Sequence, residues 1–215
     1  MSGKKEKCCF IFGAGDKTPL YNLPSDNDVV IAADGGLKYL KELGIAPDFV
    51  IGDFDSLGVI PDFDREKMKI LPCEKDTTDT HEAITAGINM NCTAFHIYGG
   101  TGGRLDHTLA NIQLLSDLSE KGYKPFLYGC GYAVTAVTNG KAEVNGEKGE
   151  YISVFSSSDI SEGVTLKNLK YTLTDGKLIN TFPLGVSNEF IGKTAEISVK
   201  KGTLLIYYSL RRLAE

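Results

Sequence analysis

The sequence predicts an α/β domain with a mainly parallel sheet, followed by an all-β domain of the sandwich or barrel type. Through about residue 128, short apolar runs alternate with segments of helical spacing, which indicates parallel strands covered by helices. After Gly129-Cys130-Gly131, short β-branched and aromatic runs follow one another without helical spacing. We therefore expect two domains, residues 1–130 and residues 131–215.

Regular spacing of apolar residues predicts the helices of the first domain. Leu105, Leu109 and Ile112 recur as they would on one face of a helix. Apolar runs bounded by turn residues, such as Val29-Val30-Ile31-Ala32, are typical of buried parallel strands. The pattern predicts strands at 7–12, 28–33, 48–52, 68–71, 94–98 and 124–128, and helices at 36–43, 78–90 and 105–120.

Turn signals divide the second domain into short segments. Asn-Gly and Asp-Gly pairs between β-branched runs are typical of hairpins, and we expect no helix between residues 132 and 205. A stretch of about 85 residues divided in this way predicts a small antiparallel sandwich or barrel. The turns are expected at Asn139-Gly140, Asn145-Gly146, Glu162-Gly163, Asp175-Gly176 and Lys201-Gly202.

Charge and hydropathy restrict the classes of partner. The net charge of −5 over 215 residues argues against a protein that binds nucleic acid by general electrostatic attraction. The apolar stretch after Lys7 is short and runs into Gly13, so we interpret it as a first buried strand and not as a signal peptide. No run approaches the roughly 20 apolar residues that span a bilayer. We expect a cytoplasmic protein without a membrane partner, whose five cysteines are plain thiols.

Carboxylates follow three of the predicted strands. Asp34 comes after the second strand, Asp53 and Asp55 after the third, and Asp76 with Asp79 after the fourth. Ligands of open parallel sheets bind outside the carboxyl ends of the strands, where these side chains are expected. Clustered carboxylates repel one another unless a cation joins them, and Mg²⁺ is the usual hard divalent ion. The sequence therefore predicts a Mg²⁺ site that takes part in phosphate chemistry.

A glycine-rich segment leads into the helix predicted at 105–120. It reads Gly99-Gly100-Thr101-Gly102-Gly103 and is followed by Arg104. Four glycines let backbone N–H groups approach a phosphate, and a helix N-terminus favours negative charge. Arg104 can hold phosphate oxygens in a fork. For Asp106 and His107, which come next, a place in the first helical turn and a structural role are the alternatives to a role in the site.

A second glycine-rich segment, Gly13-Ala14-Gly15, follows the first strand and begins like a dinucleotide-binding fingerprint. Thr18 stands in place of the third glycine and Pro19 follows, so no helix opens there to receive a pyrophosphate. We interpret the segment as a strand-to-loop turn. An accessory role near a nucleotide is the alternative.

Taken together, these residues closely resemble the motifs of the thiamine pyrophosphokinase (thiamine diphosphokinase) family. The matching segments occur in the family's order, at suitable spacing, and span most of the chain. They are Ala32-Ala33-Asp34-Gly35-Gly36, Gly52-Asp53-Phe54-Asp55-Ser56, Asp76-x-Thr78-Asp79, Gly102-Gly103-Arg104-x-Asp106-His107 and Ser187-Asn188.

The resemblance implies an enzyme that transfers the pyrophosphoryl group of ATP to the hydroxyl of thiamine, giving thiamine diphosphate and AMP. It implies an N-terminal α/β catalytic domain that binds ATP and Mg²⁺. It also implies a C-terminal β-sandwich that binds thiamine and forms a homodimer, with the sites at the subunit interface. ATP and thiamine are then small-molecule substrates, and nucleic acid is not a partner.

The resemblance also implies roles for individual residues on the ATP side. Four aspartates match the acidic Mg²⁺ and phosphate site, and Arg104 with the two glycines before it matches a phosphate-contacting position. The catalytic candidates are Asp55, Asp79 and Arg104. The metal candidates are Asp34, Asp53, Asp55 and Asp79, and the phosphate-loop candidates are Gly102, Gly103 and Arg104.

On the thiamine side, the resemblance places Asp106 near the substrate and assigns Ser187 and Asn188 to a loop contributed by the β domain. Some family members stack thiamine on a tryptophan in that loop, and this chain has no Trp. Phe190 is the nearest aromatic residue to the loop and is the candidate for the same surface. Asp79 or Asp106 is a candidate to orient the alcohol, and the sequence does not decide between them.

Two other classes of function share some of these features. Asp53-x-Asp55 also resembles the nucleophile motif of metal-dependent phosphohydrolases, although the next residues, Ser56-Leu57, match that motif poorly. A nucleotide-binding regulatory module would use the glycine loop but gives little reason for four aspartates of the metal-binding kind.

Overall fold

The structure, a computed structural model, describes residues 6–53, 63–72 and 74–211. The chain divides into two compact units, of which residues 1–111 with 127–130 form the first and residues 112–126 with 131–215 the second. The segment 112–126 therefore groups with the second unit, although it precedes residue 130. None of the described helices is long and apolar enough to cross a membrane.

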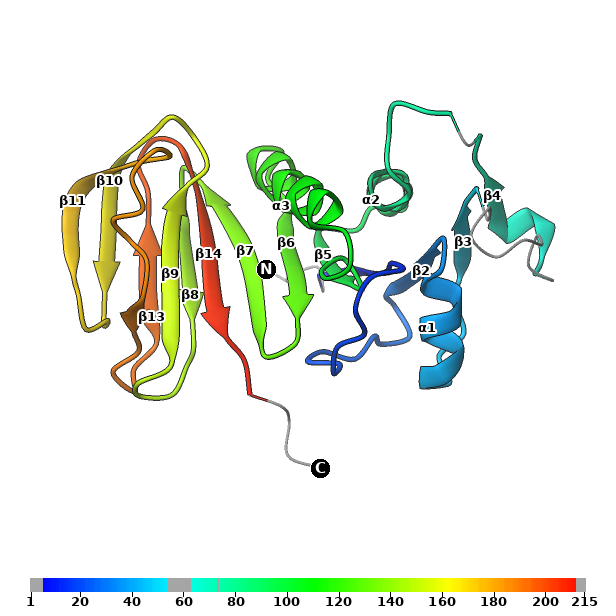
Figure 1. Cartoon of the computed structure of the whole chain (residues 1–215), viewed down its shortest axis with the longest axis horizontal. Helices are drawn as coiled ribbons and strands as arrows, with labels where there is room; N and C mark the ends of the chain where they lie inside the picture. Colours follow the sequence, from blue (N-terminus) through cyan, green and yellow to red (C-terminus); the bar gives the residue numbers. More distant parts are fainter. Residues whose placement is uncertain (1–5, 54–62, 73, 212–215) are drawn as a thin grey trace, which may run out of the picture. The chain divides into compact units, whose positions relative to one another are not determined.

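Five strands of the first unit are hydrogen-bonded in the order β5-β1-β2-β3-β4, of which β2, β3, β4 and β5 are labelled in Figure 1. Every neighbouring pair in this order is parallel. The carboxyl ends of the strands therefore meet at one edge of the sheet, as the alternation of strands and helices predicts. The strands are β1 (Cys8–Phe12), β2 (Val29–Ala33), β3 (Phe49–Gly52), β4 (Met68–Ile70) and β5 (Ala94–Tyr98).

Helices pack on this sheet where the sequence permits close approach. α1 (Gly36–Leu43) contacts β1 and β2, and α2 (Asp79–Asn89) contacts β1, β2 and β3. Gly36 permits the first contact because a Cβ there would overlap the carbonyl oxygen of Phe12. α1 ends at Gly44, whose φ of 68° is left-handed. The other elements before residue 131 are the 3₁₀ helix η2 (Arg65–Lys67), α3 (Leu105–Glu120) and β6 (Lys124–Gly129).

Stacked aromatic rings lie on the sheet of the first unit. The ring of His96 lies between Phe10 and Tyr128, with centroid distances of 4.7 and 5.9 Å. Its Nδ1 is 2.8 Å from the Tyr128 hydroxyl. Burial lowers the pKa of His96 to about 4, because the charged imidazolium would lose its hydration there. His96 is therefore neutral in the folded protein at physiological pH.

The second unit is an antiparallel β-sandwich, which confirms the predicted fold class. Four of its strands follow the order β12-β9-β14-β7, which is part of a ten-stranded sheet, and the other four form a sheet of their own in the order β11-β10-β13-β8. Apolar side chains such as Ile152, Val154, Leu166 and Ile206 form its buried core. The strands are β7 (Tyr132–Thr138), β8 (Lys141–Val144), β9 (Tyr151–Ser156), β10 (Ile160–Lys167), β11 (Leu173–Ile179), β12 (Asn188–Glu189), β13 (Ala195–Ser198) and β14 (Thr203–Ser209).

Two of the five predicted turns in this unit are wrong. Glu162-Gly163 lies inside β10 and Asp175-Gly176 lies inside β11, where the pairing of the two strands shifts register. Gly163 and Asp175 have φ angles of 68° and 51°. A β-bulge and a tight turn both use residues that tolerate positive φ, so the same dipeptides serve either purpose.

Candidate functional site

A cavity of about 520 Å³ lies at the carboxyl ends of the parallel strands in the first unit. Its walls come from the loops after β1, β2, β3 and β5 and from the segments that open α2 and α3. These loops are where ligands bind in open parallel sheets. The cavity is therefore the candidate site, and the side chains and backbone groups that line it determine its chemistry.

Two glycine-rich loops form one wall of the cavity. The N–H of Gly13 donates to the Tyr98 carbonyl oxygen at 2.8 Å, and that of Gly15 donates to the Gly99 carbonyl oxygen at 2.7 Å. A Cβ on Gly15 would lie 2.6 Å from that same oxygen and 2.5 Å from the Thr101 carbonyl oxygen. The loops after β1 and β5 are therefore joined backbone to backbone. Gly13-Ala14-Gly15 lines the cavity, in keeping with the accessory role near a ligand.

The second of these loops is shaped by positive φ angles. Gly99, Gly102 and Gly103 have φ values of 63°, 80° and 57°, which glycine adopts without strain. The buried side chain of Asn111 in α3 donates from Nδ2 to the Gly100 carbonyl oxygen at 2.7 Å. Asn111 thus fixes the loop to the helix that follows it. A loop of this kind brings backbone N–H groups close to a bound anion.

Asp34 is held at the end of β2 by an unusual backbone conformation. It follows β2 directly, has a φ of 49° and donates its N–H to the Ile51 carbonyl oxygen at 2.8 Å. Asp tolerates this left-handed region better than most residues. A Cβ on Gly52 would lie 3.0 Å from the Asp34 Cα, so glycine at the end of β3 leaves room for Asp34.

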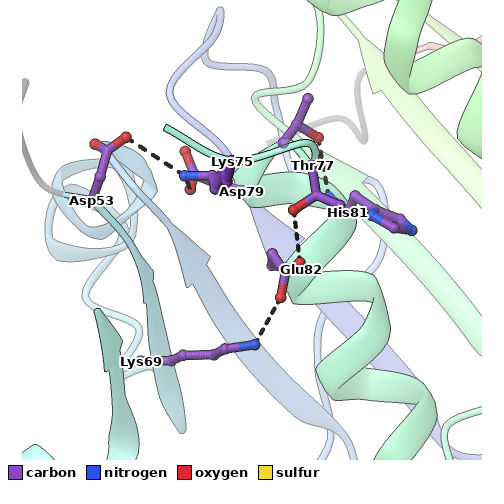
Figure 2. Close-up of polar contacts among 8 residues, drawn as sticks. Asp53, Lys69, Lys75, Thr77, Asp79, His81 and Glu82 are labelled. Atoms are coloured by element: carbon purple, nitrogen blue, oxygen red, sulfur yellow. Dashed lines mark hydrogen bonds and ion pairs between the residues drawn. The ribbon is translucent and has the colours of Figure 1, made fainter. Parts of the chain in front are cut away.

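Lys75 joins two of the predicted metal ligands. Its Nζ lies 2.8 Å from Oδ1 of Asp79 and 3.5 Å from Oδ2 of Asp53, as Figure 2 shows. The side chains of Lys75, Asp53 and Asp79 are 13%, 22% and 24% exposed, so all three are largely shielded from water. Burial alone would lower the pKa of Lys75, but the two carboxylates outweigh it and hold that pKa above its ordinary value. Lys75 is therefore a cation here.

The N-terminus of α2 places Asp79 at the cavity. Thr78 caps the helix, and its Oγ1 accepts from the N–H of His81 at 3.2 Å. Thr77 donates from Oγ1 to Glu82 at 2.7 Å, and Lys69 pairs with the other oxygen of Glu82 (Figure 2). The hydrogen bond from Lys69, and to a smaller extent that from Thr77, lowers the pKa of Glu82. The cap and these bonds fix the position of the helix start.

Arg104 lines the cavity from its rim. Its Nε and Nη2 donate to the two carboxylate oxygens of Asp106 at 3.2 and 2.5 Å, and both side chains are largely exposed. The hydrogen bond from Arg104 lowers the pKa of Asp106, so Asp106 is a carboxylate at neutral pH. His107, for which a structural role was the alternative, is exposed and also lines the cavity.

The cavity brings together most of the residues predicted for the ATP side. Asp76 is exposed and is not among the lining residues, and Asp55 lies outside the described residues. Sequence reasoning missed Lys75, although a lysine four residues before Asp79 at a helix start was a readable signal. The predicted residues that line the cavity are Asp34, Asp53, Asp79, Gly102, Gly103 and Arg104.

The described lining has the chemistry for a phosphate but does not contain a complete metal site. Within residues 6–53, 63–72 and 74–211, no group of three or more His, Cys, Asp or Glu side chains is arranged to hold a metal ion. Three carboxylates, Lys75 and Arg104 nevertheless line one cavity beside two glycine loops. Carboxylate oxygens are the ligands that Mg²⁺ prefers, and cations with backbone N–H groups are those that phosphate prefers.

In the second unit, Asn188 organises a loop of the sandwich. Its Oδ1 accepts from the N–H of Tyr171 at 2.9 Å, and its Nδ2 donates to the Tyr171 carbonyl oxygen at 2.6 Å. Ser187 precedes it with a φ of 58°, and its N–H donates to Ser153 Oγ at 3.0 Å. Asn188 is buried and Ser187 is exposed. The Ser-Asn pair therefore presents a hydroxyl to solvent and fixes the backbone of Tyr171.

Phe190 is a core residue, which corrects its assignment as a stacking surface. Its side chain is 1% exposed and belongs to the apolar core of the sandwich. A ring enclosed on all sides has no face to offer to a ligand. One exposed aromatic residue in direct contact with the Ser-Asn pair is Tyr171, which is 60% exposed, accepts and donates backbone hydrogen bonds with Asn188, and has Lys170 Nζ 5.4 Å from its ring centroid. Sequence reasoning missed it because residues 171 and 188 are joined by tertiary contact alone.

Comparisons with known proteins agree with this geometry. A family described as "Thiamin pyrophosphokinase, catalytic domain" matches residues 20–127, and "Thiamin pyrophosphokinase, vitamin B1 binding domain" matches residues 141–204. The thiamine pyrophosphokinase of Bacillus subtilis (strain 168) is 30% identical over 187 residues, which cover 83% of this chain and 86% of that protein.

Solved structures of such proteins share the fold over nearly the whole chain. The crystal structure of the Bacillus subtilis thiamine pyrophosphokinase has a TM-score of 0.81 at 28% identity and covers 95% of this chain and 99% of that one. The enzyme from Geobacillus thermodenitrificans has a TM-score of 0.80 at 26% identity, with 95% and 98% covered. The enzyme from Candida albicans is 15% identical with a TM-score of 0.73, so it supports the fold alone.

Proposed function

This chain belongs to the thiamine pyrophosphokinase family, and from that premise we propose which of its residues carry out the reaction. Its reaction is that of the family: it transfers the pyrophosphoryl group of ATP to the hydroxyl of thiamine, giving thiamine diphosphate and AMP. Membership of this family argues against the two alternative functions, a metal-dependent phosphohydrolase and a nucleotide-binding regulatory module without turnover.

We propose that the cavity of the first unit binds the triphosphate of ATP. The observation that supports this proposal most strongly is that one cavity is lined by two glycine loops, three carboxylates and two cations. The N–H groups around Gly102 and Gly103 would contact phosphate oxygens. Arg104 would leave Asp106 and bind the phosphate, because a phosphate group with two negative charges attracts the guanidinium more strongly than one exposed carboxylate does.

We further propose that carboxylates of this cavity hold a Mg²⁺ ion. Asp34, Asp53 and Asp79 line the cavity with hard oxygen ligands, and Asp55 would complete the set. When bound, Mg²⁺ would neutralise charge on the transferred group and on the departing AMP oxygen. Arg104 and the glycine-loop amides would stabilise the same charge, and the loops would align donor and acceptor. Asp79 and Asp106 remain the candidates to orient the attacking hydroxyl.

For thiamine, we propose Ser187, Asn188 and Tyr171 as binding residues. Ser187 would use its exposed hydroxyl, and Asn188 would act by fixing the backbone of Tyr171 at both its N–H and its carbonyl oxygen. The exposed ring of Tyr171 would stack on a cationic ring of the vitamin, as aromatic faces do with ligand cations. This assignment replaces Phe190.

The homodimer is a further part of the proposal. Between β11 and β12, the side chains of Phe182, Leu184 and Val186 are each more than half exposed. Neighbouring exposed apolar side chains of this size are typical of a surface covered by another protein. Light scattering coupled to size-exclusion chromatography would give about twice the mass of 23.3 kDa for a dimer. A measured mass equal to that of one chain, 23.3 kDa, at micromolar protein concentration would contradict the dimer.

A cytoplasmic location is proposed from the cysteines. Cys8, Cys9, Cys92 and Cys130 are free thiols in the structure. Cytosolic thiols are kept reduced, whereas secreted proteins commonly pair theirs. Fractionation of cells that produce the protein would test this assignment, and recovery outside the cytosol would contradict it.

The metal site is tested by neighbouring aspartates that differ in their position relative to the cavity. We expect Asp53→Asn, Asp55→Asn and Asp79→Asn each to lower thiamine-dependent AMP formation by about 100-fold or more, because each removes a ligand charge from the phosphate site. Asp76→Asn is the matched control: Asp76 is exposed and absent from the described lining, so its variant should keep near-normal turnover. Near-normal turnover of Asp79→Asn would refute the site.

A further inference from the structure

Lys75 occupies the space between two carboxylates that the proposed function gives to a metal ion. Its ammonium lies 2.8 Å from Asp79 Oδ1 and 3.5 Å from Asp53 Oδ2, and the three side chains face one another in Figure 2. Asp53 follows β3, whereas Lys75 and Asp79 come from the segment that opens α2. The lysine therefore joins two separate walls of the cavity.

The charges explain why a cation lies there. Asp53 and Asp79 are mostly shielded from water, and two such carboxylates that face one ammonium would repel each other without it. The ammonium is itself shielded and costs free energy to bury unless it is paired. The ammonium and the two carboxylates therefore stabilise one another in this shielded position. A divalent ion at the same carboxylates would replace the ammonium as the neutralising charge.

We propose that Lys75 is an exchangeable counter-ion of the active site. It neutralises Asp53 and Asp79 in the nucleotide-free protein, and it passes to phosphate oxygens of ATP when a divalent metal takes these carboxylates. The inference rests on the proposed metal site at Asp53 and Asp79.

The cavity provides the second partner that such an exchange requires. Lys75 lines the same cavity as the glycine loop at Gly99–Gly103 and as Arg104. A lysine side chain has four methylene groups and a compact charge that can follow a moving anion. Its release from the carboxylates therefore costs little when a phosphate is present to receive it.

The first test measures metal binding without nucleotide. Mn²⁺ alone is titrated into the nucleotide-free protein and followed by electron paramagnetic resonance. In Lys75→Met the competing ammonium is gone, so we expect Mn²⁺ to bind about tenfold more tightly than in the unsubstituted protein. Lys75→Arg keeps the charge and should keep the weaker affinity. A variant damaged only in its structure would bind the metal more weakly, so the direction of the change is diagnostic.

Lys121→Met is the matched control, because Lys121 likewise pairs with a carboxylate, that of Asp117, but is exposed and absent from the described lining of the cavity. Its Mn²⁺ affinity should equal that of the unsubstituted protein. In metal-free buffer, Lys75→Met should unfold at a lower temperature than the unsubstituted protein, since two carboxylates then face each other unscreened. Saturating Mn²⁺ should raise its unfolding temperature by more than it raises that of the unsubstituted protein.

The second test measures ATP. With Mn²⁺ saturating, we expect Lys75→Met to bind ATP about tenfold more weakly, because it lacks one cation that faces the phosphates. Lys75→Arg should retain most of the affinity. Unchanged ATP binding in Lys75→Met would overturn the transfer of Lys75 to phosphate.

The outcomes separate this inference from the function on which it rests. If Asp79→Asn loses Mn²⁺ binding while Lys75→Met gains none, the metal site stands and the counter-ion role of Lys75 is wrong. If Asp79→Asn binds Mn²⁺ as the unsubstituted protein does, the proposed metal site is itself wrong and the inference fails with it.

Discussion

Gly15 gives a direct perturbation of the joined glycine loops. Its φ is not positive, so alanine avoids the left-handed penalty at this position. The obstacle is space: a Cβ would lie 2.5 and 2.6 Å from the carbonyl oxygens of Thr101 and Gly99. Ordinary contacts of a Cβ begin near 3.4 Å. The Gly15→Ala variant must therefore move the two loops apart by about 0.9 Å, a gap that forfeits much of their packing contact.

This separation stretches two hydrogen bonds beyond their useful length. The bonds from Gly15 N–H to Gly99 and from Asp16 N–H to Thr101 are both 2.7 Å long, and an added 0.9 Å would break them. At about 1 kcal/mol each, their loss destabilises the loops by roughly 2 kcal/mol. The reduced entropy of the unfolded alanine chain offsets about 0.5 kcal/mol of this. Displaced phosphate-binding amides should weaken ATP binding by about 10- to 100-fold.

Two assays separate these effects. Urea denaturation gives the free energy of unfolding, and calorimetric titration with ATP and Mg²⁺ gives the affinity. Gly44→Ala is the matched control, because Gly44 ends α1 with a φ of 68° and a Cβ added there would have no atom within 4 Å. That control should lose about 1 kcal/mol from the left-handed penalty and keep its ATP affinity. Wild-type ATP affinity in Gly15→Ala would refute the role of the joined loops.

Three further predictions concern other parts of the molecule. Burial lowers the pKa of His96 from 6.5 to about 4 in the folded protein, so the unfolded state binds a proton first as the pH falls. The free energy of unfolding should therefore fall by about 3 kcal/mol between pH 6.5 and pH 4. Urea midpoints of His96→Gln should lack this part of the pH dependence, and equal slopes in both proteins would contradict the burial argument. Thr78→Ala should lose about 1 kcal/mol in urea denaturation, because the cap to His81 is removed; an unchanged midpoint would show that the cap contributes nothing. Tyr171→Ala should raise KM for thiamine about tenfold while Tyr171→Phe stays near wild type; an unchanged KM in the alanine variant would remove Tyr171 from the site.

Local sequence pattern predicts the elements of this fold well. The helices expected at 36–43 and 105–120 have those bounds in the structure, and each predicted strand of the first part is present within two residues. The reason is physical: apolar periodicity decides which face is buried, and residues such as Gly44 end helices without help from distant segments. The carboxylates at strand ends could be placed at one edge because parallel strands share that edge.

Contacts between distant segments could not be predicted in the same way. The pairing of Lys75 with Asp53 and the burial of Phe190 depend on which loops pack together, and neither residue carries a local signal for its partner. Asp175-Gly176 shows the same limit within the β-sandwich, because a bulge and a turn use the same dipeptide. The sequence therefore predicts which kinds of residue form the site, whereas the contacts between them, such as that of Lys75 with Asp53, are known only from the structure.

The activity assigned to this chain is the transfer of an intact pyrophosphoryl group from ATP to thiamine. Its most direct measurement incubates the purified protein with ATP, Mg²⁺ and thiamine and quantifies every nucleotide and thiamine product by chromatography. We expect AMP and thiamine diphosphate in equal amounts, with AMP formation dependent on thiamine. ADP with thiamine monophosphate, or free phosphate as the main product, would contradict this activity.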